Sequence, residues 1–306
     1  MKKWYLIILA AIIIAVVFFL PAEKTLIEKF DAPCPYSAPT RLMTDQKQWK
    51  KWWPGEMIND TSYKINERIF VPDRIMLNEI TALNRKNETE IILNLQFASV
   101  SSTQTGFTVI STYRFSRNHF KRIWQYFDYL KWKDEHKIIS ARLLEFFSDT
   151  KKIYGYNIEK KKIPNSPHLA ITQEFVNEPD WNEIYGLINE LREYVASQHG
   201  KVVNDPIMNI FVEQGKFKVM VAVATDRILP ATDRYMLKQM VLGNQLEIEV
   251  KGSNYKIREA QVQIENYLTD YGKTFPAIPF QRLITDRSKV KDSTQWITTL
   301  NYPIFE

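Results

Sequence analysis

The second half of the chain carries the same order of elements twice, and this duplication constrains the fold more than any other feature. The first copy predicts a strand, a helix and two further strands, at residues 171–176, 178–198, 207–213 and 217–224. The second copy predicts the same series at residues 246–250, 254–271, 280–286 and 296–302. Such a repeat indicates two related units that can pack about a pseudo-two-fold axis. The cleft left between them is a common place for a small ligand.

Three motifs of the second copy carry a resemblance to a known family. They are Gly252–Tyr255 before the helix, Pro279–Asp286 after it, and Trp296–Ile304 near the end. Together with the repeat, they make residues 153–306 resemble the gyrase-inhibitor-like effector-binding domain of AraC-type bacterial transcription activators. The resemblance implies a duplicated strand–helix–strand–strand domain that binds small, often lipophilic molecules.

The strand after Pro279 departs from that family's pattern. Glutamate is usual at the position of Gln281, and tyrosine at the position of Leu283. An amide can form hydrogen bonds, but it cannot neutralise a cation or act as a base. This departure favours a small, neutral, apolar ligand.

Six residues are the predicted ligand-binding set. Gln281 and Leu283 share one strand face, and the repeat makes Met208 and Ile210 their counterparts. Aromatic side chains bury a large area and keep a polar group, which adds two further candidates. The full set is Met208, Ile210, Tyr255, Gln281, Leu283 and Trp296. The alternative is that these side chains fill a core between the two copies.

Residues 25–152 follow a different order: an early strand, short helical segments, several antiparallel strands, and one long helix at 118–149. With Ala32–Pro33, Leu42, Asp45, Trp49 and Trp52–Pro54 in sequence, this region resembles the START-like (SRPBCC) superfamily of polyketide cyclases and dehydrases. The resemblance implies a helix-grip fold, in which a curved antiparallel sheet wraps around the last helix and typically encloses an apolar cavity.

Two predictions concern aromatic side chains of this domain. Apolar residues of the long helix fall three and four positions apart, which predicts one buried face. These residues are Phe120, Ile123, Trp124, Phe127 and Leu130. The tryptophans at positions 49, 52 and 53 either line a cavity mouth or pack the short helices onto the sheet, and packing is favoured.

Residues 1–24 contain an uninterrupted apolar run from Trp4 to Leu20, preceded by Lys2 and Lys3. At a rise of about 1.5 Å per residue, a helix of this length approaches the thickness of a bilayer core. It is either a cleavable signal peptide or a retained transmembrane anchor. Phe18–Pro21 lacks the small residues of a cleavage site, which favours the anchor. The positive-inside rule then predicts a single-pass membrane protein with its domains on the extracytoplasmic, periplasmic side.

Residues that carry catalysis are scarce. The four histidines are scattered, and no two have metal-ligand spacing. The nine glycines form no phosphate-binding loop. No nucleophile elbow is present, and the lone Cys34 has no base near it in sequence. We therefore predict no catalytic residue, no metal and no cofactor.

The expected partners follow from charge and hydropathy. The net charge of +6 is spread over the chain, without a helix-turn-helix, a zinc-finger spacing or an aromatic-rich RNA signature. We therefore expect no nucleic-acid partner. The expected partners are a small lipophilic molecule and, through the N-terminal helix, the membrane. The sequence leaves the oligomeric state open.

The sequence thus predicts an α+β protein with an N-terminal transmembrane helix, a START-like domain and a duplicated effector-binding domain. Its predicted function is a membrane-anchored, outward-facing binding protein for a small, neutral, apolar ligand. One alternative is a hydrolase or cyclase acting on a small apolar or electrophilic substrate, which needs a titratable group in a cleft. Another is an envelope interaction module without a ligand, which needs a large exposed apolar patch.

Overall fold

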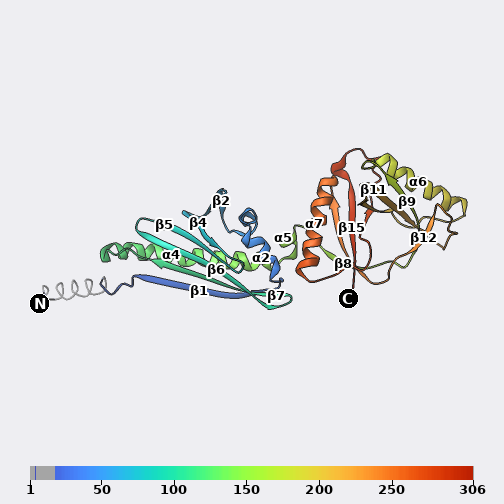
Figure 1. Cartoon of the computed structure of the whole chain (residues 1–306). Helices are drawn as coiled ribbons and strands as arrows, with labels where there is room; N and C mark the ends of the chain where they lie inside the picture. The colour runs from blue at the N-terminus through green and yellow to red at the C-terminus, as the bar shows by residue number, and fades with distance from the viewer. Residues whose placement is uncertain (1–3, 5–17, 306) are drawn as a thin grey trace. The chain divides into compact units, whose positions relative to one another are not determined.

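The computed structural model describes residue 4 and residues 18–305. The chain divides into two compact units, Met1–Ile153 and Tyr154–Glu306 (Figure 1). Each unit has its own curled sheet with helices packed on it, and every strand pairing in the two sheets is antiparallel. The α+β class is therefore observed.

One part of the predicted fold class was wrong. No helix among the described residues is long and apolar enough to cross a membrane, so the predicted N-terminal transmembrane helix is not supported. The run from Trp4 to Leu20 lies at the short end of the roughly 17–25 apolar residues that a span requires. Most of this run, residues 5–17, lies outside the described part of the chain. The membrane as a partner therefore gains no support either.

The first unit is built from a seven-stranded sheet and one long helix, α4, His119–Phe147. The strand order is β1-β7-β6-β5-β4-β3-β2. Side chains of β6 alternate between buried and partly exposed up to Phe97, so one sheet face packs on the core and the other faces solvent. The strands are β1 Glu23–Ala32, β2 Glu56–Asn59, β3 Ser62–Ile65, β4 Arg68–Ile75, β5 Glu79–Lys86, β6 Thr89–Ser101 and β7 Gln104–Arg114. The short helices are α2 Ser37–Thr44, η1 Gln46–Gln48, α3 Trp49–Trp52 and α5 Thr150–Tyr154.

The predicted buried face of α4 was wrong. Phe120, Trp124 and Phe127 are exposed, at 64%, 76% and 58% of their surface. The residues that α4 buries have the same spacing but lie further along the helix: Tyr129, Trp132, His136, Ile139, Leu143 and Phe147. Both sets satisfy the three-and-four spacing of an apolar helix face. Only the contact with the sheet, which the sequence does not display, decides between them.

The tryptophan cluster packs the short helices onto the sheet, as predicted. Trp49, Trp52 and Trp53 are all buried. The indole Nε1 atoms of Trp49 and Trp52 donate to carbonyl oxygens of α2 at 2.6 and 3.2 Å, and that of Trp53 donates to one in β3 at 3.2 Å. Ring pairs between α4 and the sheet, with centroids 5.1 and 5.4 Å apart, fill the space below. The START-like resemblance of this unit stays a prediction.

The second unit contains the predicted repeat on one eight-stranded sheet, of order β12-β9-β11-β10-β14-β15-β13-β8. The first copy is β9 Pro167–Phe175, α6 Trp181–Ser197, β10 Ile207–Glu213 and β11 Lys216–Ala224. The second copy is β13 Asn244–Lys251, α7 Asn254–Asp270, β14 Phe280–Leu283 and β15 Ile297–Ile304. The remaining elements are β8 Glu159–Lys162, β12 Met236–Gln239 and η2 Ser293–Gln295.

The two copies are related by a pseudo-two-fold axis between β10 and β14. The order β9-β11-β10 on one side mirrors β14-β15-β13 on the other. Only two residue pairs join the copies there, Ile207 with Arg282 and Met208 with Gln281. The central seam of the sheet is therefore short.

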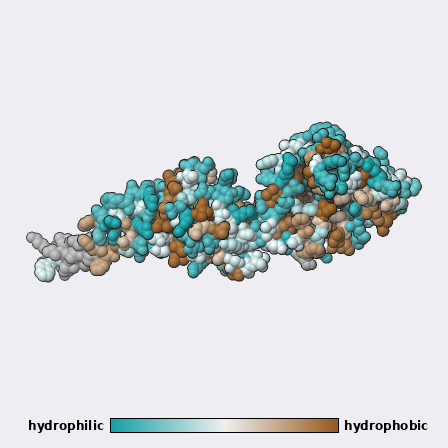
Figure 2. All heavy atoms as spheres, in the orientation of Figure 1, coloured by the Kyte–Doolittle hydropathy of each residue, from teal (hydrophilic) through white to brown (hydrophobic). Residues whose placement is uncertain are grey.

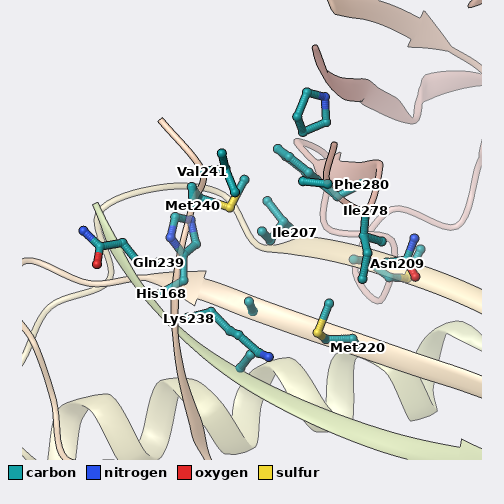
Figure 3. Close-up of a pocket in the computed structure, with 15 residues that line it drawn as sticks. His168, Ile207, Asn209, Met220, Lys238, Gln239, Met240, Val241, Ile278 and Phe280 are labelled. Atoms are coloured by element: carbon teal, nitrogen blue, oxygen red, sulfur yellow. The ribbon is translucent and has the colours of Figure 1, made fainter. Parts of the chain in front are cut away.

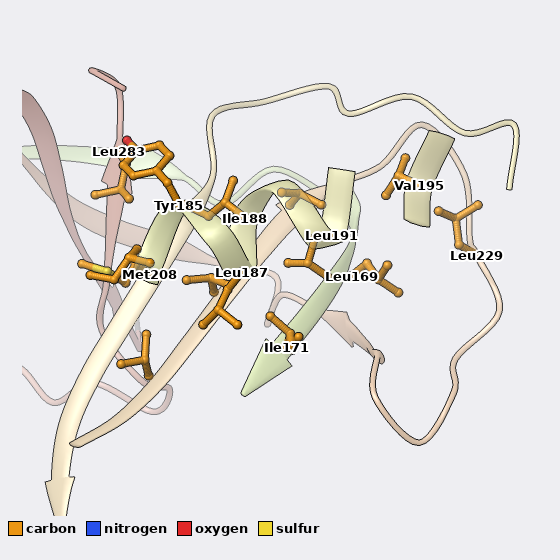
Figure 4. Packing of buried hydrophobic residues seen from close by; sticks show 14 residues of the cluster. Leu169, Ile171, Tyr185, Leu187, Ile188, Leu191, Val195, Met208, Leu229 and Leu283 are labelled. Atoms are coloured by element: carbon orange, nitrogen blue, oxygen red, sulfur yellow. The ribbon is translucent and has the colours of Figure 1, made fainter. Parts of the chain in front are cut away.

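Each helix covers the strands of its own copy. The apolar face of α6 packs on β9, β10 and β11 in a cluster that includes Met208 and Leu283 (Figure 4). The apolar face of α7 packs on β13 and β15 in a cluster that includes Leu300. Met208 and Leu300 both pair with Gln281 in register, so all three side chains lie on one sheet face. Both helices therefore lie on the same face.

Candidate functional site

A cleft lies on that face, between α6 and α7. It consists of two adjoining hollows of about 170 and 150 Å³. Both hollows share Met208 and Ile210 from β10, Gln281 from β14 and Gln261 from α7. We call this site the central cleft. It lies where the two copies of the repeat meet, which is where the duplication predicts a ligand site.

The start of α6 forms one wall of the central cleft. Asp180 accepts a hydrogen bond from the backbone N–H of Glu183, and the Glu183 carboxylate accepts one from the N–H of Asp180, each at 2.8 Å. This reciprocal capping box fixes the first turn of the helix. Trp181 and Ile184 of that turn line the cleft. The sequence analysis did not single out Trp181 or Gln261, although the Asp–x–x–Glu motif marks where this wall begins.

Three of the six predicted ligand residues line the central cleft. Met208, Ile210 and Gln281 lie together there because strand alternation turns them to the same side of the sheet. Contact with a ligand stays a prediction for each of them.

The other three predicted residues lie elsewhere. Leu283 is buried in the core beneath α6. Tyr255 is 68% exposed on α7 and is absent from the residues that line the cleft. Trp296 packs behind the cleft wall, with its ring centroid 5.5 Å from that of Trp181 and its Nε1 donating to the carbonyl oxygen of Val290 at 2.8 Å.

The central cleft offers amides and apolar surface rather than buried charge. Gln261 and Gln281 supply the amides, which can each donate and accept hydrogen bonds. The charged lining residues, Glu178 and Arg258, are exposed to solvent. Tyr302, at the other end, donates to the Glu265 carboxylate at 3.2 Å; burial and that carboxylate raise the pKa of the phenol. In the described part of the chain, no three His, Cys, Asp or Glu residues lie close enough to hold a metal ion.

A second, larger hollow of about 300 Å³ lies on the opposite face of the sheet (Figure 3). We call it the rear cavity. Its floor comes from residues of β9, β10 and β11, and its sides come from β12 and from the segments 239–241 and 277–280. The lining residues with the most distinctive chemistry are His168, Asn209, Met220, Lys238, Met240 and Phe280.

The sequence analysis missed the rear cavity because it considered only the helix-covered face. A signal was present in the small residues Ala170 and Ala222. They pair in register on the rear face, where larger side chains would fill the hollow. That pairing depends on strand register, which neither strand reveals alone.

Comparisons with known proteins return only distant similarity. No protein-family model matches the chain, and no curated protein matches it. The solved C-terminal domain of EcmrR is similar with a TM-score of 0.42 and 16% identity, covering 49% of this chain and 98% of that one. A hydrolase from Listeria innocua has a TM-score of 0.39 and 10% identity, covering 49% of this chain and 92% of its own. SAV2435 bound to tetraphenylphosphonium has a TM-score of 0.34 and 14% identity, with coverages of 49% and 94%.

These TM-scores and identities are too low to carry an argument about this chain. The fold and the two hollows therefore rest on the structure alone. The resemblance of residues 153–306 to the gyrase-inhibitor-like domain stays a prediction from the sequence.

Proposed function

We propose that the second unit binds a small, neutral, largely apolar molecule in the central cleft. The observation that carries the proposal is the combination of apolar walls with two amides, Gln261 and Gln281, at the meeting point of the two copies. Burial against Met208, Ile210 and Trp181 would supply binding free energy at about 25 cal/mol per Å² of apolar surface. The amides would orient the ligand through hydrogen bonds.

The charge pattern supports a neutral ligand. A cation buried in a cleft needs a carboxylate in contact with it, because an unpaired buried charge is strongly disfavoured. Position 281 presents an amide, and the lining carboxylate Glu178 is exposed. The same pattern gives no support to catalysis, which needs a titratable group beside the reacting atom.

On the visible face of both units, hydrophobic side chains are interspersed with hydrophilic ones (Figure 2). The exposed Phe120, Trp124 and Phe127 of α4, with the rings of Trp124 and Phe127 6.3 Å apart, are the observation that favours the second candidate, an interaction surface on the first unit.

The test uses two variants that fill hollows on opposite faces of one sheet. Ile210→Trp places an indole in the central cleft, and Met220→Trp places one in the rear cavity. Native mass spectrometry of the full chain, incubated with a library of neutral lipophilic compounds, should detect ligands retained by Met220→Trp and lost from Ile210→Trp. A protein that binds no member of the library, or whose ligands are all lost only from Met220→Trp, contradicts the proposal.

A charge substitution provides a second test of the proposed function. Gln281→Glu introduces a carboxylate into the central cleft, so the variant should bind the lipophilic cation tetraphenylphosphonium at least about tenfold more tightly than the native protein does. Gln281→Leu, which is similar in size and uncharged, is the matched control and should show no gain. Equal affinity in all three proteins would mean that position 281 does not face the ligand.

A further inference from the structure

The floor of the rear cavity is hollow because small side chains meet there. Ala222 lies between Ile207 of β10 and Ala170 of β9 in register, and Met236 of β12 follows on the far side of Ala170. Two neighbouring methyl groups thus lie between larger side chains. The sides include Met220 and Met240, and the flexible thioether of methionine adapts to ligands of varied shape.

One end of the rear cavity presents a buried hydrogen-bond acceptor without a partner. The side-chain Nδ2 of Asn209 donates to the carbonyl oxygen of Pro279 at 2.7 Å, which fixes the orientation of the amide. The Oδ1 atom is buried and has no hydrogen-bond partner in the described part of the chain. Asn209 shares a strand face with Ile207, which lines the cavity floor. An unpaired buried acceptor costs free energy that a donor on a ligand would recover.

The other end presents a second acceptor. Nδ1 of His168 lies 2.9 Å from the carbonyl oxygen of Ser166. A carbonyl only accepts, so Nδ1 carries the proton and Nε2 has the lone pair. Burial lowers the pKa of His168, which keeps the ring neutral at pH 7. No residue of the described chain donates to Nε2. Figure 3 shows His168 and Asn209 toward opposite ends of the cavity.

We propose that the rear cavity is a second binding site, for a neutral, flexible, apolar molecule that carries a hydroxyl or N–H donor, such as a medium-chain alcohol. Asn209 Oδ1 takes the donor, His168 Nε2 offers a second acceptor at the other end, and the methionine- and alanine-lined space between them holds the apolar chain. Both acceptors repel an anionic head group. Two cations lie nearby: Lys238 lines the cavity and is exposed to water, and Arg282 is half-buried in the adjoining hollow beside His168.

This site is distinct from the one proposed above. Successive side chains of β10 point to opposite faces of the sheet, although Met208, Asn209 and Phe280 border both hollows. Ile210 lines the central cleft and not the rear cavity, and Met220 lines the rear cavity and not the central cleft, so substitutions at these two positions separate the sites.

The test is NMR of the full chain labelled with ¹³C at the methionine methyl groups, titrated with 1-octanol, its methyl ether and octanoate. Octanol should saturably shift the resonances of Met220 and Met240. The ether has no donor, so it should bind about tenfold more weakly, and octanoate should bind more weakly than octanol. Asn209→Leu should reduce the preference of octanol over the ether to about twofold or less, because it removes the acceptor and keeps the volume.

The two tryptophan variants identify which hollow is occupied. Met220→Trp should abolish the octanol shifts at Met240, and Ile210→Trp should leave them intact. Loss of the shifts in Ile210→Trp would assign octanol to the central cleft and overturn the proposal. Equal binding of octanol and ether by the native chain, tighter binding of octanoate, or no saturable shift would overturn it as well. The comparison of three probes on the native chain needs no variant to fold.

Discussion

Each unit buries one arginine among the described residues, and the two surroundings differ in kind. Arg68 of the first unit is 5% exposed and Arg287 of the second is 1% exposed. Arg68 donates to the Glu135 carboxylate at 2.7 Å and to both oxygens of Asp128 at 2.8 and 3.0 Å. Arg287 has no carboxylate partner in the described chain. Its guanidinium carbon lies 4.0 and 4.9 Å from the ring centroids of Trp181 and Trp296.

The difference is visible in the pKa values. Burial lowers the pKa of Arg68, but hydrogen bonds and charge from Asp128 and Glu135 outweigh it, so the net pKa is raised. Burial lowers the pKa of Arg287 to about 10, with only a small opposing effect from Tyr185. The first unit thus neutralises its buried charge. The second keeps one without a counter-ion among the described residues, where Nε and Nη1 have no hydrogen-bond partner and Nη2 donates to the Thr298 hydroxyl.

This contrast extends to the hollows. The first unit fills the space between α4 and its sheet with aromatic rings. The second leaves open space on both sheet faces, with the unpaired Asn209 Oδ1 at one of them and Trp181, which stacks on Arg287, at the other. Unpaired buried polar atoms occur in both units, with Asn84 Oδ1 and His136 Nε2 among those of the first, so they do not by themselves mark a site. The contrast lies instead in the filled space beneath α4 of the first unit and the two hollows beside the sheet of the second.

The largest effect is expected from Arg68→Met. The change leaves Glu135 mostly buried without its cation, which should cost about 3 kcal/mol of unfolding free energy, at the lower end of the usual range because Asp128 is partly exposed. Hydrogen exchange of amides in β6 and β7 under denaturant would measure this cost within the first unit. The matched control is Arg74→Met on the same strand, an exposed pair with Glu79 that should cost about 0.5 kcal/mol or less. Equal costs in the two variants would contradict the prediction.

A smaller effect is expected from acid. His136 of the first unit is buried, with Nδ1 3.0 Å from the Ser111 hydroxyl and no partner for Nε2 in the described part of the chain, and burial lowers its pKa. The unfolded chain takes up this proton near pH 6.5 and the folded chain only at lower pH. Folding stability therefore falls as the pH drops below about 6.5, until the folded pKa is reached. His136→Gln has no titrating group, so the first unit should lose less stability between pH 7.5 and 5.

Denaturant midpoints at the two pH values measure this difference. His168→Gln provides the comparison in the second unit, since burial lowers the pKa of His168 in the same direction. Among the described residues, no hydrogen bond to its Nε2 is formed beside the open rear cavity, where a ligand donor would hold the ring neutral. An unchanged pH dependence in His136→Gln would show that other groups cause the acid sensitivity of the first unit.

The sequence predicted the fold best where the pattern is local. The repeat set the order of eight elements, and most of their predicted boundaries lie within a few residues of the observed ones. The pattern failed in α4, where two sets of residues share the spacing of a buried face. Which set meets the sheet depends on the tertiary contact, so Phe120 and Trp124 were assigned to the core and lie in solvent. The predicted transmembrane helix is not supported, because no described helix is long and apolar enough to cross a membrane.

The candidate site likewise has one part that the sequence predicted and another that it did not. Strand alternation is local, so it brought Met208, Ile210 and Gln281 to one cleft. The position of Tyr255 depends on the rotation of α7, and that of Trp296 depends on the path of a loop; neither has a short-range signal. The rear cavity depends on the register of Ala170 against Ala222, two residues on strands that are separated in sequence by a helix and another strand.

The smallest effect is expected from Arg287→Met, and it sharpens the comparison most. Replacing a buried charge that has no counter-ion removes a desolvation cost. It also removes the two tryptophan contacts, each worth about 0.5–2 kcal/mol, and the hydrogen bond to the Thr298 hydroxyl. These contributions oppose one another, so the unfolding free energy should change by about 1 kcal/mol or less in either direction. Hydrogen exchange in β13 and β15 would measure it. A cost as large as that of Arg68→Met would mean that Arg287 is paired in the folded protein, and the two units would then bury charge in the same way.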